Sequence, residues 1–458
     1  MDKKQIAFFA GPISAMAIAI FLHQTGYSSE IIWTAAVSTL VAIWWIFEPI
    51  SIPATSLIPL AIFPLSGVLT QSEVAAAFGN KLILLMLGGF MLSAAMEKSG
   101  AHRRIALGMV NLFGRSGGKG LVLGFMAASA LLSMWISNAA TALMLLPIAM
   151  AVVNQTDNRR LQFSLLLGIA YASSVGGVCT PIGTPPNMIF ISVLAEHNGN
   201  EMSFIDWMSY SVPVVALMLP LVGFWLTRGL SDVKPVELPD TGDWRRKEIL
   251  TLLVFAFTAV TWVTRQQPLG GWSSLLGLTS ANDAQVAILG SIAMFLIPNG
   301  EGGKLLDWDS AKKIPWGILI LFAGGICIAK AFGSSGLSAE LGNLLASLNS
   351  LPLLLLIGSI CLAVTFLTEV TSNTATTTLL MPILLAAALA AQMDPKIFMI
   401  PATISASFAF MLPVATPPNA IVYGAQKFTV NEMAREGLVL NLIGVLVVTL
   451  ICSVFFAA

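Results

Sequence analysis

The chain has 458 residues, of which 56% are hydrophobic and only 10% are charged, and its mean hydropathy is +0.85. This composition excludes a soluble globular protein and predicts a protein embedded in a lipid bilayer. The 23 Lys and Arg residues balance the 23 Asp and Glu residues, so the overall charge does not indicate nucleic acid or an anionic surface as a partner.

Apolar stretches long enough to cross a bilayer as helices recur along the chain, and no long alternating pattern indicates a β-barrel. Two further stretches, 119–153 and 351–392, are too long for one span, and a Ser-Asn cluster interrupts each of them. We therefore predict an all-α polytopic membrane protein with about 11 transmembrane helices and two re-entrant hairpins. The predicted spans are 5–23, 31–49, 52–70, 80–100, 161–196, 206–228, 247–265, 283–298, 315–333, 396–426 and 435–457.

The placement of Lys and Arg predicts the orientation of the two hairpins, because these residues stay in cytoplasmic loops. They flank the first hairpin, at 98–119 and at 159–160, so both of its ends are expected to face the cytoplasm. The segment 333–350 before the second hairpin has no Lys or Arg, which places the entry to that hairpin outside. The two halves are thus predicted to have opposite orientations in a bacterial inner membrane, with the N-terminus cytoplasmic and the C-terminus outside.

Three sequence blocks occur twice in the same order. LGGFMLSAAMEKSG at 87–100 matches AGGICIAKAFGSSG at 323–336. SNAATALMLLPI at 137–148 matches SNTATTTLLMPI at 372–383, and PIGTPPN at 181–187 matches PVATPPN at 413–419. Together with the opposite orientations, these blocks predict an inverted repeat, which in secondary transporters places the binding site near the bilayer midplane. The predicted segments are a first helix in 1–30, a first repeat in 31–230 with its broken helix at 161–196, and a second repeat in 231–458 with its broken helix at 396–426.

The Thr-Pro-Pro-Asn motifs are expected to break their helices, because proline has no N–H to donate to the carbonyl four residues earlier. An unsatisfied carbonyl at bilayer depth costs several kcal/mol, so such a break survives only against protein, water or a bound cation. Gly183 and Ala415 are small enough to let an ion approach the backbone. The prolines also begin the next half-helix, whose positive end is predicted to face the same cavity.

The hairpin tips carry hydroxyl and amide groups that can bind carboxylate or sulfate oxygens or a hard cation. These tip residues are Ser137, Asn138, Ser372, Asn373 and Thr374. Because Ser and Asn are favoured N-caps, we expect each returning arm to begin there and to point its positive end at the solute. One such cluster is more often an ordinary interhelical hydrogen bond, and one Thr-Pro-Pro is more often a kink. Their joint recurrence favours a binding site.

Glu369 stands beside the second tip and has two open interpretations. Acids inside a membrane are costly and often functional. A carboxylate tied to a neighbouring helix end explains it equally well.

The paired Ser-Asn-Thr-type tips, each followed by a helix broken at Thr-Pro-Pro, closely resemble the divalent anion/sodium symporters, the INDY-type dicarboxylate transporters. The resemblance covers nearly the whole chain. It implies a homodimer with a fixed scaffold domain and a transport domain that moves like an elevator. It also implies import of a C4-dicarboxylate such as succinate, or of citrate or sulfate, together with sodium ions.

The resemblance also assigns residues to the sites. One sodium site would use Ser133, Ser137, Asn138 and the carbonyl of Gly183, and the second would use Thr368, Thr371, Asn373 and the carbonyl of Ala415. The substrate would contact Ser137, Asn138, Ser372, Asn373 and Thr374, with Thr184, Thr416 and Pro417 nearby. Ala139 stands where the family pattern often has Thr. The identity of the anion therefore stays open, as does the number of sodium ions.

Membrane energetics favour coupling to cations, because importing a dianion against about 100 mV costs about twice 2.3 kcal/mol. Three sodium ions would leave one net positive charge entering. A sodium-independent exchange of dicarboxylates is the main alternative. An intramembrane enzyme is disfavoured, since no nucleophile, base and orienting group occur together at membrane depth, and a channel fits two inverted hairpins less well.

Overall fold

The computed structural model describes residues 3–114, 117–198, 202–230, 242–266, 271–278, 280–345 and 352–457. Apart from one isolated bridge between Pro298 and Lys304, these ranges contain helices and connecting loops and no strand. The predicted all-α class is confirmed. Two predictions fall partly outside the described residues. They are the boundary between the two repeats, at 230–231, and the last part of the segment 333–350.

The helices are numbered along the chain. They are α1 (Lys3–Gln24), α2 (Ser29–Phe47), α3 (Ile52–Thr55), α4 (Leu57–Leu65), α5 (Gln71–Phe78), α6 (Lys81–Ser99), α7 (Ala101–Gly114), α8 (Gly117–Ser133), α9 (Asn138–Val153), α10 (Arg159–Gly177), α11 (Pro185–Asn198), α12 (Phe204–Thr227), α13 (Arg246–Val263), α14 (Gly271–Leu275), α15 (Asp283–Leu296), α16 (Trp308–Ala311), α17 (Trp316–Ser335), α18 (Leu337–Leu345), α19 (Leu353–Thr368), α20 (Asn373–Ala390), α21 (Pro395–Ala406), α22 (Pro417–Tyr423) and α23 (Val430–Ala457).

Among the described residues, seven helical stretches are long and apolar enough to cross a membrane by length and composition. The count of about 11 spans stays a prediction. The stretches predicted at 52–70 and 283–298 form shorter apolar helices. Those predicted at 161–196 and 396–426 are each split in two by a loop.

The stretch predicted as one span at 52–70 divides at Ser56 because Pro59 has no N–H for the carbonyl of Thr55. The Ser56 hydroxyl donates to the carbonyl of Ile52 at 2.8 Å and accepts from the indole of Trp45 at 3.0 Å. Gly67, with φ at 78°, then turns the chain after α4.

Five helices, α5, α7, α14, α16 and α18, lie between the predicted spans and hairpins. In α7, Leu107 and Val110 are buried while Arg103 is exposed. The helix is therefore amphipathic, and a search for unbroken apolar runs does not detect such a helix.

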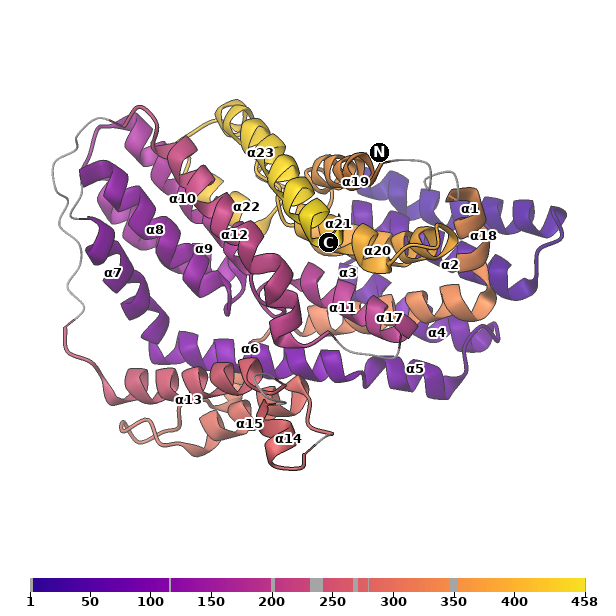
Figure 1. Cartoon of the computed structure of the whole chain (residues 1–458), viewed down its shortest axis with the longest axis horizontal. Coiled ribbons are helices and arrows are strands. Elements are labelled where there is room, and N and C mark those ends of the chain that lie inside the picture. The colour runs from indigo at the N-terminus through magenta and orange to yellow at the C-terminus, as the bar shows by residue number, and fades with distance from the viewer. Residues whose placement is uncertain are drawn as a thin grey trace.

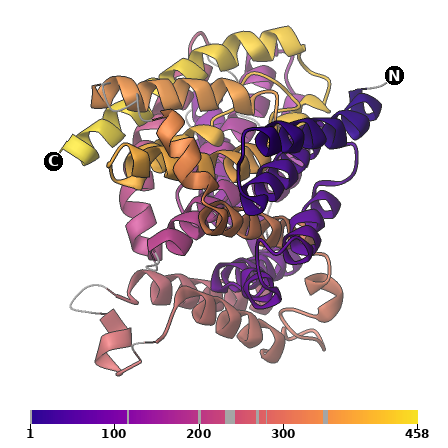
Figure 2. The ribbon, with the colours of Figure 1, turned by 90° about the vertical axis from the view of Figure 1, so that its right-hand side faces the viewer.

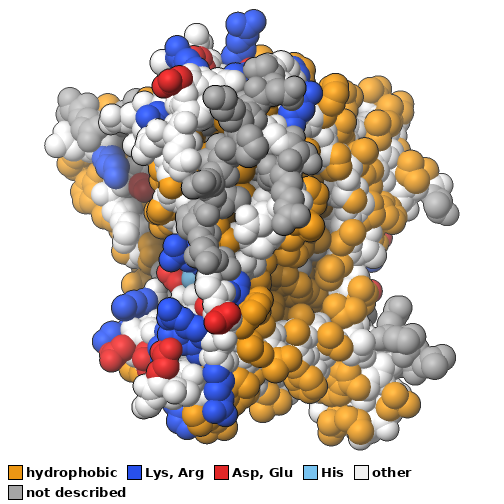
Figure 3. All heavy atoms as spheres, turned by 90° about the vertical axis from the view of Figure 1, so that its left-hand side faces the viewer, with side chains coloured by type: hydrophobic (Ala, Val, Ile, Leu, Met, Phe, Trp, Pro, Cys, Tyr) orange, Lys and Arg blue, Asp and Glu red, His pale blue; other side chains and the backbone are white. Residues whose placement is uncertain are grey.

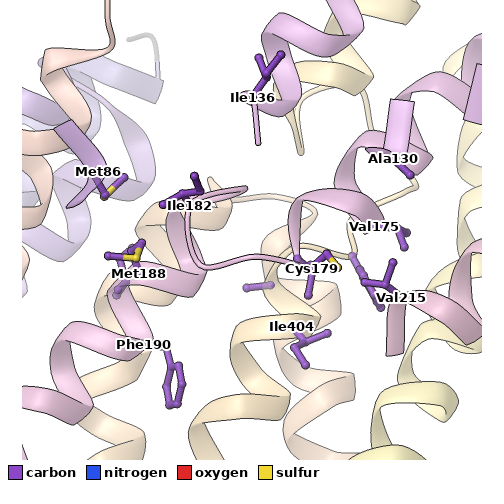
Figure 4. Close-up of a cluster of buried hydrophobic side chains, with 14 of the residues drawn as sticks. Met86, Ala130, Ile136, Val175, Cys179, Ile182, Met188, Phe190, Val215 and Ile404 are labelled. Carbon is purple, nitrogen blue, oxygen red and sulfur yellow. The ribbon is translucent and has the colours of Figure 1, made fainter. Parts of the chain in front are cut away.

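Helices α8, α9, α10 and α12 lie together in the left half of Figure 1, and α6 packs with α13 and α15 in a layer below them. Helices α1 and α2 form a pair that packs on the side away from the C-terminus in the turned view of Figure 2. Buried apolar side chains fill and surround the α10–α11 break (Figure 4). Cys179 and Ile182 belong to the break itself, and Met86 of α6, Ile136 of the α8–α9 turn and Ile404 of α21 lie around it. The break is thus enclosed by protein, which is the condition for irregular backbone in a membrane protein.

Candidate binding site at the hairpin tips and helix breaks

The first hairpin turns at the Ser-Asn cluster, as predicted. Helix α8 ends at Ser133 and α9 begins at Asn138. Ser137 is the N-cap, and its hydroxyl accepts from the Ala140 amide at 3.2 Å. In the second hairpin α19 ends at Thr368, and Ser372 holds the same position with an extended backbone but makes no side-chain capping bond.

Both Thr-Pro-Pro-Asn motifs break their helices where the sequence predicts. The chain unwinds after Gly177 and resumes as α11 at Pro185, and it unwinds after Ala406 and resumes as α22 at Pro417. The hydroxyl of Thr416 caps α22 by accepting from the backbone N–H of Asn419 at 3.3 Å.

Ser133 is the centre of an oxygen cluster at the base of the first tip. Its hydroxyl contacts Asn138 Oδ1 and lies 2.7 Å from the carbonyl oxygen of Ser173. Because a hydroxyl has one hydrogen, it can donate to only one of these two acceptors at a time. Hydroxyl, side-chain amide and backbone carbonyl oxygens are ligands that a hard cation binds.

Glycines allow the first break to approach this cluster. A Cβ built on Gly177 would overlap Asn138 Oδ1, and one built on Gly183 would overlap the carbonyl of Gly177 and lie 3.0 Å from the carbonyl oxygen of Ser133. The structure therefore brings together three residues of the first predicted sodium site: Ser133, Asn138 and Gly183. Ser137, the fourth, is exposed at the tip.

Thr368 repeats this arrangement in the second half. Its hydroxyl lies 2.8 Å from Asn373 Oδ1 and 2.9 Å from the carbonyl oxygen of Ala406. Thr371 of the second predicted sodium site donates to the carbonyl of Leu367 at 2.8 Å. Ala415 is buried in the α21–α22 loop, where its amide donates to the carbonyl of Leu412 at 3.2 Å. That bond leaves the Ala415 carbonyl, the predicted ligand, unaffected.

The last residues of the two Thr-Pro-Pro-Asn motifs, Asn187 and Asn419, were not singled out from the sequence. Each is fully buried, and its side-chain N–H groups donate to carbonyls of the unwound loop. Each also has a buried Oδ1 without a hydrogen-bond partner among the described residues. The signal that could have found them is the repetition of the Asn itself.

Glu369 is buried and bonded to the backbone of the second break. Its carboxylate accepts from the amides of Met411 at 2.9 Å and Leu412 at 3.0 Å, and from the side chain of Asn441 at 2.7 Å. The hydroxyl of Tyr171, in the first broken helix, donates to the carbonyl of Phe410 at 2.7 Å. The contacts agree best with the structural interpretation of Glu369, as an acid tied to a neighbouring segment, here a loop rather than a helix end.

The two hairpins and the two broken helices pack crosswise. Helix α22, after the second break, packs against α9 of the first hairpin, and α11, after the first break, packs against α20 of the second hairpin. Of the predicted substrate residues, Ser137 and Pro417 are exposed, Asn138, Ser372, Asn373 and Thr374 are half-buried, and Thr184 and Thr416 are buried. The tips are thus more accessible than the oxygen clusters at their bases.

The first tip also contacts α13. Trp135 stacks on Trp262 with ring centroids 6.5 Å apart and meets Phe255 edge-on at 5.3 Å. Phe204, at the start of α12, stacks on Trp262 at 4.9 Å.

Known proteins resemble the chain over nearly its full length. The family model described as citrate transporter matches residues 42–397. Proteins from Staphylococcus aureus strains, including bovine RF122 and NCTC 8325, are named sodium-dependent dicarboxylate transporter SdcS. They are 38% identical over 472 residues, which cover 97% of this chain and 90% of theirs. The chain belongs to the divalent anion/sodium symporter family. The family predicted from the motifs is therefore confirmed, and its members are transporters rather than enzymes.

Two solved transporter structures share the fold. The Alcanivorax borkumensis YdaH transporter aligns with a TM-score of 0.59 and 14% identity over 86% of this chain and 88% of its own. Neisseria gonorrhoeae MtrF, from a class of antimetabolite efflux pumps, aligns with a TM-score of 0.59 and 15% identity over 87% and 84%. At these identities the likeness concerns the fold alone.

Proposed function

We propose that this symporter-family protein imports a C4-dicarboxylate such as succinate together with sodium ions. The observation that carries the proposal is the duplicated oxygen cluster, in which Ser133 and Thr368 each join an Asn side-chain oxygen to a backbone carbonyl. The S. aureus relatives named sodium-dependent dicarboxylate transporters support both the cation and the anion class.

Sodium would bind at the two clusters, with the tips above them binding the dianion. The first site would use Ser133, Ser137, Asn138 and the carbonyl of Gly183. The second would use Thr368, Thr371, Asn373 and the carbonyl of Ala415. The helices that begin at Asn138 and Asn373 direct positive ends toward the anion, so its charge needs no buried Lys or Arg. Bound sodium would order the tips and thereby create the anion site.

The transport cycle would be of the elevator type, in a homodimer. The mobile part would contain α8–α11 and α19–α22, which include the hairpins and the broken helices, and the scaffold would include α6, α13, α15 and α17. The two repeats would have opposite orientations in a bacterial inner membrane, with a cytoplasmic N-terminus, and the Lys and Arg distribution supports this. The crosswise packing of α9 with α22 and of α11 with α20 supports a shared site between the halves.

Uptake into proteoliposomes tests this function. Succinate, citrate, sulfate and aspartate are supplied outside, each with an inward sodium gradient or with potassium in its place. We expect accumulation of succinate above its external concentration only with the sodium gradient. If internal and external succinate exchange equally fast with and without sodium, the protein is instead a sodium-independent dicarboxylate exchanger. A preference for citrate or sulfate would replace succinate as the proposed substrate. Such a difference would agree with Ala139, which has no hydroxyl at the first tip.

A further inference from the structure

A recess lined mainly by arginine lies where α10 and α23 begin and α12 ends, away from the hairpin tips. Its volume is about 560 Å³, and Figure 3 looks onto the end of the molecule that carries it. We call it the arginine recess. It is lined by Arg159, Arg160, Phe163, Arg228, Glu432, Arg435 and Glu436.

The ion pairs inside the arginine recess leave an excess of positive charge. Glu432 pairs with Arg159 at 2.7 Å. Glu436 pairs with two guanidinium groups, Arg160 at 2.9 Å and Arg228 at 2.5 Å. Four guanidinium groups thus face two carboxylates, so two positive charges have no counter-charge within the recess.

Donors remain for an outside ligand. Arg160 Nη2 is buried, and the described residues provide no hydrogen-bond partner for it. Arg435 is exposed and forms no ion pair with any described side chain. The guanidinium of Arg228 lies 3.4 Å from the ring centroid of Trp225, and that of Arg160 lies 5.4 Å from Phe163, which holds both groups in place. Fixed guanidinium groups with free N–H donors bind phosphate oxygens in pairs.

An exposed apolar stripe leads away from the recess on each of two neighbouring helices. On α23, Leu438, Leu442 and Leu446 follow Arg435 at helical spacing, with exposures of 39%, 44% and 62%. On α12, which packs against α23, Leu217 and Phe224 are 46% and 74% exposed, and Phe224 lies one turn before Arg228. A soluble anion would make no apolar contact with these stripes, whereas the two acyl chains of a phospholipid can cover them.

We propose that the arginine recess binds the phosphodiester headgroup of an anionic phospholipid, whose acyl chains lie along the stripes of α12 and α23. Basic recesses between membrane helices are suited to such headgroups. In the orientation proposed above, the recess lies at the cytoplasmic leaflet. This site is independent of the transport site, since no residue of the oxygen clusters lines it.

Lipid retention by the purified full-length protein tests the proposal. The protein is exchanged into detergent micelles containing either phosphatidylglycerol or phosphatidylcholine, and bound lipid is counted by native mass spectrometry. A parallel series contains inorganic phosphate in large excess and no lipid. We expect retention of phosphatidylglycerol at least fivefold above that of phosphatidylcholine, and a rise in the unfolding temperature with the anionic lipid only.

Three variants locate the site. R160Q removes the buried free donor but also the bond to Glu436, so its folding is checked by size exclusion. R435Q breaks no ion pair, and it should fold and lose at least half of the preference for phosphatidylglycerol. R103Q removes an exposed arginine of α7 outside the recess and should leave the preference unchanged. Equal retention of the two lipids, equal effects of R435Q and R103Q, or full stabilisation by phosphate without lipid would each overturn the proposal.

Discussion

Asn187 and Asn419 make the same contact in the two halves of the molecule. Each donates from Nδ2 to a carbonyl seven residues earlier, that of Thr180 at 2.7 Å and that of Leu412 at 3.1 Å. Asn187 also donates to the carbonyl of Gly177 at 3.1 Å, and Asn419 to that of Ala409 at 2.9 Å. These bonds fix the unwound segments that carry the carbonyls of the proposed sodium sites.

We predict that Asn187→Ala weakens sodium binding more than it weakens succinate binding at saturating sodium. Losing the donor to a buried carbonyl costs about 1–3 kcal/mol, roughly a 5- to 150-fold rise in the half-saturating sodium concentration. Uptake rates over a sodium series measure this, and Asn419→Ala should behave in parallel. Asn154→Ala, at an exposed position at the base of the first hairpin, is the control. An equal change in both affinities would show that the Asn has only a general structural role.

Gly177→Ala is predicted to disable the first oxygen cluster, because its Cβ would overlap Asn138 Oδ1. Such overpacking costs about 1–3 kcal/mol of stability. The unfolding temperature of the variant should no longer rise when sodium replaces potassium. Gly333→Ala, where a Cβ meets no atom within 4 Å, should retain the sodium response. A retained response in Gly177→Ala would contradict the placement of a cation beside Asn138.

Ala139→Thr is predicted to strengthen anion binding by restoring a hydroxyl at the first tip. A hydrogen bond to a charged group contributes about 1.5–3 kcal/mol, so the KM for succinate should fall roughly tenfold or more. Ala139→Val has the same shape without the hydroxyl and serves as the control. A similar fall in both variants would assign the effect to packing rather than to hydrogen bonding.

Glu196 connects the proposed mobile part to the scaffold. Its carboxylate, on α11, lies 3.5 Å from Lys330 Nζ on α17 and accepts from the Asn80 side chain at 3.2 Å. Because the pair is partly exposed, it contributes about 0.2–1 kcal/mol. We predict that Glu196→Gln changes the turnover rate by up to about fivefold and leaves the half-saturating sodium concentration unchanged. The charge swap, Glu196→Lys with Lys330→Glu, should restore the rate; failure of the swap would argue against a role for this ion pair in the motion.

Glu369→Gln is predicted to destabilise the second break. The substitution places an amide NH2 where a carboxylate oxygen accepts from the amide of Met411 or Leu412. The expected loss is about 1.5–3 kcal/mol, visible as a lower unfolding temperature in both sodium and potassium. A normal unfolding temperature combined with lost sodium dependence would favour the functional interpretation of this acid.

The positions of both tips and both breaks were predictable because each depends on local chemistry. Ser137 caps a helix, and Pro185 and Pro417 cannot continue one, whatever surrounds them. The pairing of Ser133 with Asn138 followed from the repeat and the resemblance.

The features that the sequence did not predict depend on tertiary contacts. Asn187 donates to carbonyls, and Glu369 accepts from amides, of loops whose conformation depends on packing. Helix α7 is stabilised by burial of the apolar face of an amphipathic helix. The Thr371 hydroxyl donates to the carbonyl of Leu367 within its own hairpin, and the spacing of residues in the sequence does not predict this partner.

In the proposed mechanism, the duplicated oxygen clusters around Ser133 and Thr368 bind sodium and thereby form the anion site. Equilibrium binding of radiolabelled succinate to the purified protein, over a sodium series with potassium as the replacing ion, tests it most directly. We expect no binding in potassium alone and a sodium dependence steeper than first order, with a lower order in Ser133→Ala and in Thr368→Ala. Succinate binding of undiminished affinity in sodium-free potassium buffer would show that sodium at these clusters does not form the anion site.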